Sequence, residues 1–141
     1  MIRPKIRVAQ NSDAEVIQQI LKANDMFTEG LDWSRLYPNW LIAEWKRKPI
    51  GCVQFLIGYP VGMIPMLAVL PGYRDSGTGM YLMWAAEELL RQAGCDGFLG
   101  ITDSGRVLKK LPKLGGLEIG EFTLFVKRIF RDIKKEEVIN G

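Results

Sequence analysis

The chain has 141 residues, of which 48% are hydrophobic and 25% are charged, as expected for one globular domain that buries a core without disulfides or metals. Its 19 basic and 16 acidic residues leave a net charge of +3, which is too small to indicate a nucleic-acid-binding protein but would help to attract a polyphosphate. Because no apolar run reaches the ~18 residues of a membrane helix and no signal-peptide pattern is present, we expect a cytoplasmic protein with no membrane partner.

The first third of the chain predicts a strand, a helix and an irregular segment. Ile6 to Ala9 is short and apolar enough for a strand. Ser12, three residues before Glu15, predicts a capping box at the start of a helix near Asp13–Ala23. The stretch from Asn24 to Asn39 is less regular and favours a short helix and a packed loop.

A hairpin and a further strand are predicted next. Trp40–Trp45 and Pro49–Gly58 are apolar segments on either side of the charged turn Lys46-Arg47-Lys48, which is typical of a hairpin. The segment Met63–Leu70 reads as a strand, although Pro65 cannot donate to a sheet ladder. We therefore expect a bulge or a missing partner at Pro65.

The remaining elements predict an α/β fold of mixed strand direction. A long helix crosses to a fifth strand, which should therefore lie parallel to the fourth, and a short helix and a closing hairpin follow. We expect a single domain over residues 1–130 with about seven strands flanked by helices, and a charged tail over 131–141. These later elements are Met80–Ala93, Phe98–Thr102, Val107–Leu111, Leu117–Ile119 and Phe122–Phe130.

The residues available for chemistry are restricted by composition. The chain contains no histidine, which excludes Ser-His and Cys-His nucleophile pairs and removes the commonest metal ligand and general base. Cys52 and Cys95 are far apart and have no metal-type spacing. We expect both cysteines to pack in a strand or a turn, and we predict no metal cofactor.

The segment from Leu67 to Gly79 is the most informative, because it joins a strand to a helix through a glycine-rich loop. Amides near Gly77 and Gly79 would lie at the positive end of the helix, where they suit a phosphate, and Arg74 adds a positive charge. A dinucleotide fingerprint would need a glycine at Leu82. A P-loop would need a lysine where Thr78 stands. An ordinary turn before a surface helix is the alternative interpretation.

The spacing R-x-x-G-x-G over Arg74–Gly79, preceded by V-x-P at Val69–Pro71, resembles the coenzyme A pyrophosphate loop of the GNAT superfamily of N-acetyltransferases. The resemblance extends from Ile6 to Ile129. It implies the GNAT fold, acetyl-CoA as cosubstrate, direct acetyl transfer to an amine, and a bulged fourth strand that splays from the fifth. The implied coenzyme-binding residues are Leu67, Ala68, Val69, Arg74, Asp75, Ser76, Gly77, Thr78 and Gly79.

Two proton-transfer residues of the family do not carry over. Leu111 stands where many relatives have a tyrosine, and the strand Met63–Leu70 contains no acidic residue. The candidate catalytic residues are therefore Tyr59, Tyr73, Asp103 and Ser104. Each also has a structural interpretation: Tyr59 as a turn residue, Tyr73 as packing beside the loop, and Asp103 or Ser104 as a helix N-cap.

Two functions of different class follow. The first is an acetyl-CoA-dependent N-acetyltransferase whose acceptor is a small-molecule or protein amine. The second is a non-catalytic acyl-CoA-binding module that has kept the loop and lost the proton-transfer residues. Nucleic acid is disfavoured as a partner, because the basic groups are interrupted and lie mostly at turns and in the tail. The sequence leaves open the acceptor, the acyl chain length and whether the protein forms a homodimer.

Overall fold

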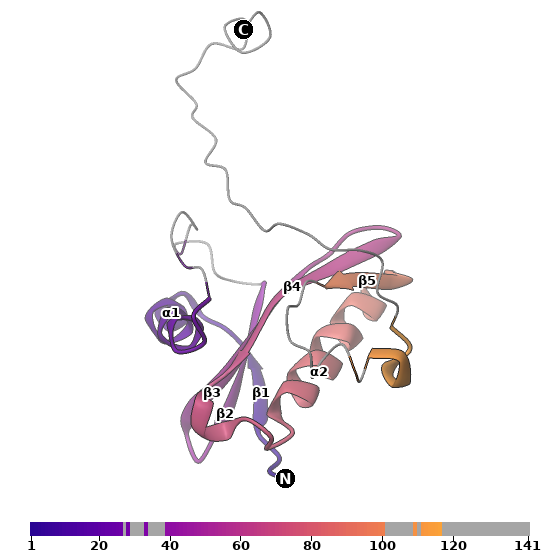
Figure 1. Ribbon diagram of the computed structural model, residues 1–141. Helices are drawn as coiled ribbons and strands as arrows, with labels where there is room; N and C mark the ends of the chain where they lie inside the picture. The colour runs from indigo at the N-terminus through magenta and orange to yellow at the C-terminus, as the bar shows by residue number, and fades with distance from the viewer. Residues whose placement is uncertain (27, 29–32, 34–38, 101–108, 110, 117–141) are drawn as a thin grey trace, which may run out of the picture.

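A five-stranded sheet with the strand order β1-β2-β3-β4-β5 separates two helices in the part of the chain that the computed structural model describes (Figure 1). The described residues are 1–26, 28, 33, 39–100, 109 and 111–116. The strands are β1 (Lys5–Val8), β2 (Trp40–Trp45), β3 (Lys48–Leu56), β4 (Val61–Val69) and β5 (Gly97–Gly100), and the helices are α1 (Ala14–Lys22) and α2 (Thr78–Gln92), with 3-10 helices η1 (Asn11–Asp13), η3 (Pro71–Tyr73) and η4 (Leu111–Leu114).

The strand directions confirm the predicted α/β sheet. Strands β1 to β4 pair antiparallel in chain order, whereas β5 pairs parallel to β4 because α2 crosses between them. The predicted strand Trp40–Trp45 is observed with the same bounds. Two further predicted strands, Leu117–Ile119 and Phe122–Phe130, and the tail over 131–141 lie outside the described residues, so the sheet is described with five strands rather than about seven.

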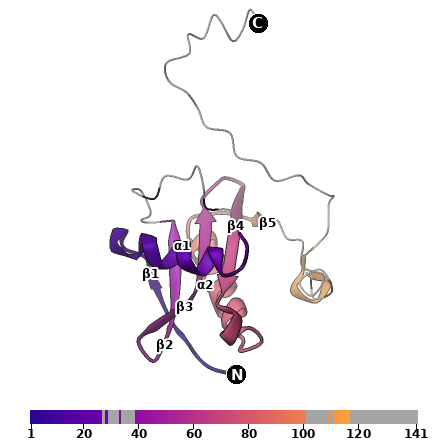
Figure 2. The same cartoon turned by 60° about the vertical axis from the view of Figure 1, so that its left-hand side comes forward.

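The hydrophobic core consists of two layers, one on each face of the sheet (Figure 2). Successive side chains of a strand point to opposite faces, so Ile42 packs in the α1 layer while its neighbour Leu41 packs in the α2 layer. Cys52 belongs to the α1 layer, where burial raises the pKa of its thiol to about 12. This confirms the predicted packing role. None of the described helices is long and apolar enough to cross a membrane.

The helix start near residue 13 differs from the predicted capping box. Reciprocal hydrogen bonds join Gln10 and Asp13 instead of Ser12 and Glu15: the Gln10 amide donates to Asp13 Oδ2 at 2.7 Å, and the Asp13 amide donates to Gln10 O at 2.9 Å. Arg7 is the reason, because its guanidinium donates to both Asp13 oxygens at 2.7 and 2.8 Å. The carboxylate is thus held toward β1, and the capping residue is Gln10, two residues earlier than the predicted Ser12.

The bulge predicted at Pro65 is confirmed. Gln54 pairs with Met66 and Leu56 pairs with Met63, so β4 carries one extra residue against β3 at this point. Proline has no N–H to place in the ladder, and the bulge accommodates it. On the other side of β4, pairing with β5 reaches Ile64 within the described residues.

The short helix predicted over Val107–Leu111 lies mostly outside the described residues. Lys109 is helical, and η4 then spans Leu111–Leu114. Pro112 therefore lies within a helical turn and does not end one, since a first turn needs no proline N–H.

Candidate functional site

The connection between β4 and α2 is a short, internally bonded loop. After Val69, the 3-10 helix η3 reverses the chain, with the Tyr73 amide donating to Leu70 O at 2.8 Å. The Ser76 amide then donates to Tyr73 O at 3.3 Å, and α2 begins at Thr78. The helix starts two residues earlier than predicted, so Gly79 belongs to its first turn.

Gly77 adopts a conformation that requires glycine. It is the N-cap of α2 with φ +88°, and a Cβ there would lie 3.4 Å from Met1 Cε. The residues on either side anchor it, because Ser76 Oγ and Thr78 Oγ1 lie 2.7 Å apart and the Thr78 amide donates to Ser76 Oγ at 3.3 Å. Thr78 is only 1% exposed. The turn is therefore shaped by the protein's own contacts before any ligand is considered.

The first turn of α2 presents backbone amides to the loop. The Tyr81 amide bonds to Gly77 O at 3.2 Å, and by helix geometry the amides of Thr78, Gly79 and Met80 have no acceptor within the helix. This end also carries the positive pole of the helix dipole. Such a terminus suits a phosphate group.

Gly79 leaves a space between α2 and β4 that the fold itself does not require. A Cβ at this position would lie 3.6 Å from Leu67 Cδ2 and 3.9 Å from Val69 Cγ2, which are ordinary contacts. An alanine would thus fit the protein. Glycine at residue 79 is therefore not required by the packing of the fold, and its lack of a side chain is compatible with close approach of a phosphate to the backbone.

The three predicted coenzyme-binding residues of β4 face different ways. The Leu70 amide donates to Ile50 O at 2.7 Å, so the alternation of an antiparallel ladder turns the backbone groups of Leu67 and Val69 away from β3. No described strand pairs with that edge beyond Ile64. Ala68 pairs with Cys52 of β3 and is buried in the α1 layer. The backbone groups of Leu67 and the amide of Val69 can therefore pair with an extended ligand, whereas Val69 O accepts from the Asn24 side chain.

Arg74 is exposed, as predicted, and it is also hydrogen-bonded to a residue that the sequence motif does not contain. Its Nη2 donates to Asn24 Oδ1 at 2.8 Å, and the Asn24 side chain donates in turn to Val69 O at 3.0 Å. Asn24 follows α1 directly. The one sequence signal for it is a polar residue at a helix end, which does not indicate its partners.

The two described candidate catalytic residues, Tyr59 and Tyr73, are not brought together. Tyr73 packs against the α2-side core with Lys48 Nζ 5.6 Å from its ring centroid, while Tyr59 is 85% exposed in the turn before β4. Tyr59 precedes and Tyr73 follows the nine-residue strand β4. A strand of this length spans about 30 Å, so the two tyrosines lie at opposite ends of it. Asp103 and Ser104 lie outside the described residues.

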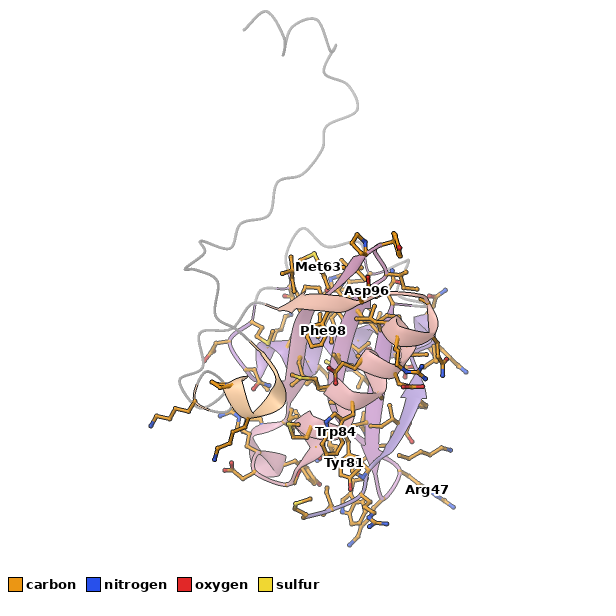
Figure 3. The ribbon with its side chains drawn as sticks, turned by 90° about the vertical axis from the view of Figure 1, so that its right-hand side faces the viewer. Arg47, Met63, Tyr81, Trp84, Asp96 and Phe98 are labelled. Carbon is orange, nitrogen blue, oxygen red and sulfur yellow. The ribbon has the colours of Figure 1, made fainter. Side chains whose placement is uncertain are left out.

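A side view of the sheet separates its two ends (Figure 3). Met63 and Asp96 mark the end where β4 begins, and Tyr81 and Arg47 lie toward the end with the loop. Within the described ranges, no group of three or more cysteine, aspartate or glutamate side chains is placed to hold a metal ion.

Comparisons with known proteins agree with this geometry. The model of the acetyltransferase (GNAT) family matches residues 9–115. No curated protein matches the sequence. Among solved structures, Rv2747 from Mycobacterium tuberculosis, in complex with CoA, has a TM-score of 0.69 and 20% identity over 86% of this chain and 76% of that chain.

Two other structures are similar at the level of the fold. The aminoglycoside N-acetyltransferase AAC(6')-Iy in complex with CoA has a TM-score of 0.67 and 19% identity, covering 90% of this chain and 96% of that chain. N-acetylglutamate synthase from Neisseria gonorrhoeae, complexed with coenzyme A and L-arginine, has a TM-score of 0.69 and 20% identity over 78% of this chain, which spans only 27% of the synthase chain. From the family match over residues 9–115, we conclude that this chain belongs to the GNAT acetyltransferase family.

Proposed function

We propose that this protein is an acetyl-CoA-dependent N-acetyltransferase that transfers the acetyl group directly to an amine acceptor. The observation that carries the proposal is the amide-lined first turn of α2, opened by the left-handed Gly77 and kept free of a side chain at Gly79. In this proposal the amides of Gly79 and Met80 hold the pyrophosphate, Thr78 supports the turn through its bond to Ser76 Oγ, and Arg74 adds charge at the loop. Asp75 and Ser76 complete the loop's backbone.

The edge of β4 beyond Ile64, with which no described strand pairs, supports the second half of the binding site. Leu67 and Val69 turn backbone groups outward where no described strand pairs with them. Because Val69 O already accepts from Asn24, the Leu67 groups and the Val69 amide are the ones that can bond an extended pantetheine arm and orient its acyl end. Bound acetyl-CoA supplies a thioester whose thiolate, with an ordinary thiol pKa near ~8.5, leaves without a strong acid. The chain's main contribution is then orientation of the acceptor amine against the carbonyl, which can supply several kcal/mol.

The acceptor is an amine that must lose a proton before or during attack. Tyr59, Tyr73, Asp103 and Ser104 remain the proposed proton-transfer candidates. Of the two tyrosines, Tyr73 lies at the end of β4 that carries the loop, so it is the candidate nearer along the chain to the proposed coenzyme site. A small molecule and a protein amine both remain open as acceptors, with cytoplasmic action expected.

A non-catalytic acyl-CoA-binding module is the second candidate. It is favoured by two observations: β4 contains no acidic residue, and exposed Tyr59 lies at the end of β4 away from the loop. This alternative keeps the whole coenzyme site and predicts binding without turnover.

The two candidates are separated by measuring binding and turnover on one preparation. Saturation with CoA or acetyl-CoA at a hundred times the dissociation constant should stabilise the protein by about 2.7 kcal/mol in thermal unfolding. Release of CoA from acetyl-CoA is then measured over a panel of small amines, protein lysines and aminoacyl-tRNA. Stabilisation with release supports the enzyme, stabilisation without release supports the module, and no stabilisation of a folded sample contradicts both.

A further inference from the structure

Asn24 connects three separate parts of the fold. Its Nδ2 donates to Ile20 O of α1 at 2.9 Å and to Val69 O at the end of β4 at 3.0 Å. Its Oδ1 accepts from Arg74 Nη2 at 2.8 Å. One half-buried side chain thus joins α1, β4 and the coenzyme loop.

The end of α1 holds Asn24 in place. The Met26 amide donates to Leu21 O and the Asp25 amide donates to Lys22 O, both at 3.0 Å, which is the paired pattern of a Schellman motif. Asp25 has φ 55°, as this motif requires of the residue after the cap. Asn24 is therefore fixed through its backbone before its side chain reaches the loop.

The chemistry of the amide allows one orientation only. An amide group carries two N–H donors and one oxygen acceptor. Here the donors meet the carbonyls of Ile20 and Val69 and the oxygen meets a guanidinium. The reverse orientation would place oxygen against two carbonyl oxygens and N–H groups against a cation. The side chain is consequently a rigid acceptor for Arg74.

We infer that Asn24 is a positioning residue of the coenzyme site, which holds the Arg74 guanidinium on the end of β4 so that its remaining N–H groups act with the α2 amides on one diphosphate. The inference rests on the proposed function. Arg74 is exposed and would otherwise sample many rotamers, and ordering it would weaken binding. The hydrogen bond to Asn24 orders Arg74 before the ligand binds, which removes part of that cost. A guanidinium has five N–H donors and uses one of them here, so the others remain for the diphosphate.

The coupling between Asn24 and Arg74 is measured with a double-mutant cycle by isothermal titration with CoA. The variants are Asn24→Leu, which keeps the side-chain volume without hydrogen bonds, Arg74→Ala, and the two combined. We expect Asn24→Leu to weaken CoA binding about 5- to 10-fold, and to weaken it less than 2-fold when Arg74 is already alanine. Gln19→Leu, at an exposed position of the same helix, is the matched control and should bind CoA like the parent.

Pantetheine, which lacks the diphosphate, gives a readout that a merely structural role would not produce. Its affinity should change less than 2-fold in Asn24→Leu, and raising the salt concentration should reduce the difference between parent and variant for CoA. Equal losses for CoA and pantetheine, or multiplicative effects of the two substitutions, would overturn the inference. Asn24→Ala provides a second variant with the same expectations if Asn24→Leu does not fold.

The design also separates this inference from the function on which it rests. Absence of CoA binding by the folded parent protein would overturn the proposed function and the role of Asn24 together. Normal binding by the parent with unchanged binding by Asn24→Leu would overturn the role of Asn24 alone.

Discussion

The two ends of β4 use their backbone groups in different ways. At the end where β4 begins, pairing with β5 runs through Ile64, the Asp96 amide donates to Pro60 O at 2.7 Å, and Cys95 Sγ donates to Gly58 O at 2.9 Å. At the other end, the outer edge near Val69 has no described partner strand and the first turn of α2 opens beside it. From this contrast we expect the binding capacity of the protein to lie in backbone groups directed outward, and exposed Tyr59 at the closed end to add little to it.

Blocking the open end should have the largest effect. Gly77→Val forces a β-branched residue into φ +88° and brings its side chain against Met1, so we expect CoA affinity to fall about a hundredfold or more. Isothermal titration with CoA measures the loss, and circular dichroism checks that the fold survives.

Gly72→Ala is the matched control in the same connection. A Cβ at residue 72 meets nothing within 4 Å, so CoA binding should remain near that of the parent. Unchanged binding by Gly77→Val would show that the open end of β4 is not the coenzyme site.

Side-chain chemistry should matter less than orientation. Single-turnover acetyl transfer in Tyr59→Phe, Tyr73→Phe, Asp103→Asn and Ser104→Ala should fall by tens-fold or less in each variant, because orientation carries most of the rate and the thiolate leaves unaided. CoA affinity, measured in parallel, should stay close to that of the parent. A loss above about a thousandfold in one variant, equivalent to ~4 kcal/mol, would identify a dedicated acid or base and contradict this expectation.

Gly79 allows ligand approach to be separated from protein strain. Gly79→Ala meets only ordinary contacts with Leu67 and Val69, so the unliganded protein should be unchanged or stabilised by up to about 1 kcal/mol. CoA affinity should nevertheless fall about tenfold if the ligand approaches the backbone at residue 79, because the methyl group lies between α2 and the β4 residues Leu67 and Val69. Thermal unfolding without ligand and titration with CoA give the two values. Full CoA affinity in this variant would mean that the ligand does not approach α2 at residue 79.

The sequence predicted the features that depend on local backbone chemistry. A few neighbouring residues are enough to predict three of them: the glycine turn that opens α2, the bulge at Pro65 and the strand Trp40–Trp45. The parallel fifth strand followed from the helix that crosses to it. These predictions needed no knowledge of distant contacts.

The features that the sequence did not predict depend on contacts between distant residues. Asn24 meets Arg74 and Val69 only when α1 packs beside β4, and nothing near residue 24 indicates either partner. The predicted capping box at Ser12 is wrong because Arg7 of β1 hydrogen-bonds to Asp13, and the pattern around Ser12 does not indicate this contact.

The smallest expected effect on CoA binding concerns a polar frame formed by Arg7, Asp13 and Glu44. The hydrogen bond from Arg7 is the main cause that lowers the pKa of Asp13 in the folded protein, with burial acting in the opposite direction. Glu44 of β2 also contacts Arg7, so the cluster joins β1, η1 and β2. Because the folded pKa lies below the unfolded value of ~3.9, the stabilisation is fully present above about pH 4 and is lost as the pH falls through the folded pKa.

Asp13→Asn should therefore lower the free energy of unfolding by about 1–2 kcal/mol at pH 7, and this difference from the parent should shrink as the pH approaches 3. Urea unfolding at several pH values measures both, with Glu15→Gln as the control at an exposed position of the following helix. CoA affinity at pH 7 should remain within about twofold of the parent, since the loop and the open edge of β4 make no described contact with this carboxylate. A parallel shift of the two stability curves down to pH 3 would show that Asp13 does not titrate with a lowered pKa. A large loss of CoA affinity would show that the open end of β4 depends on the contacts of Asp13. The two ends of β4 would then differ in how the rest of the fold supports them, and not only in how many backbone groups they expose.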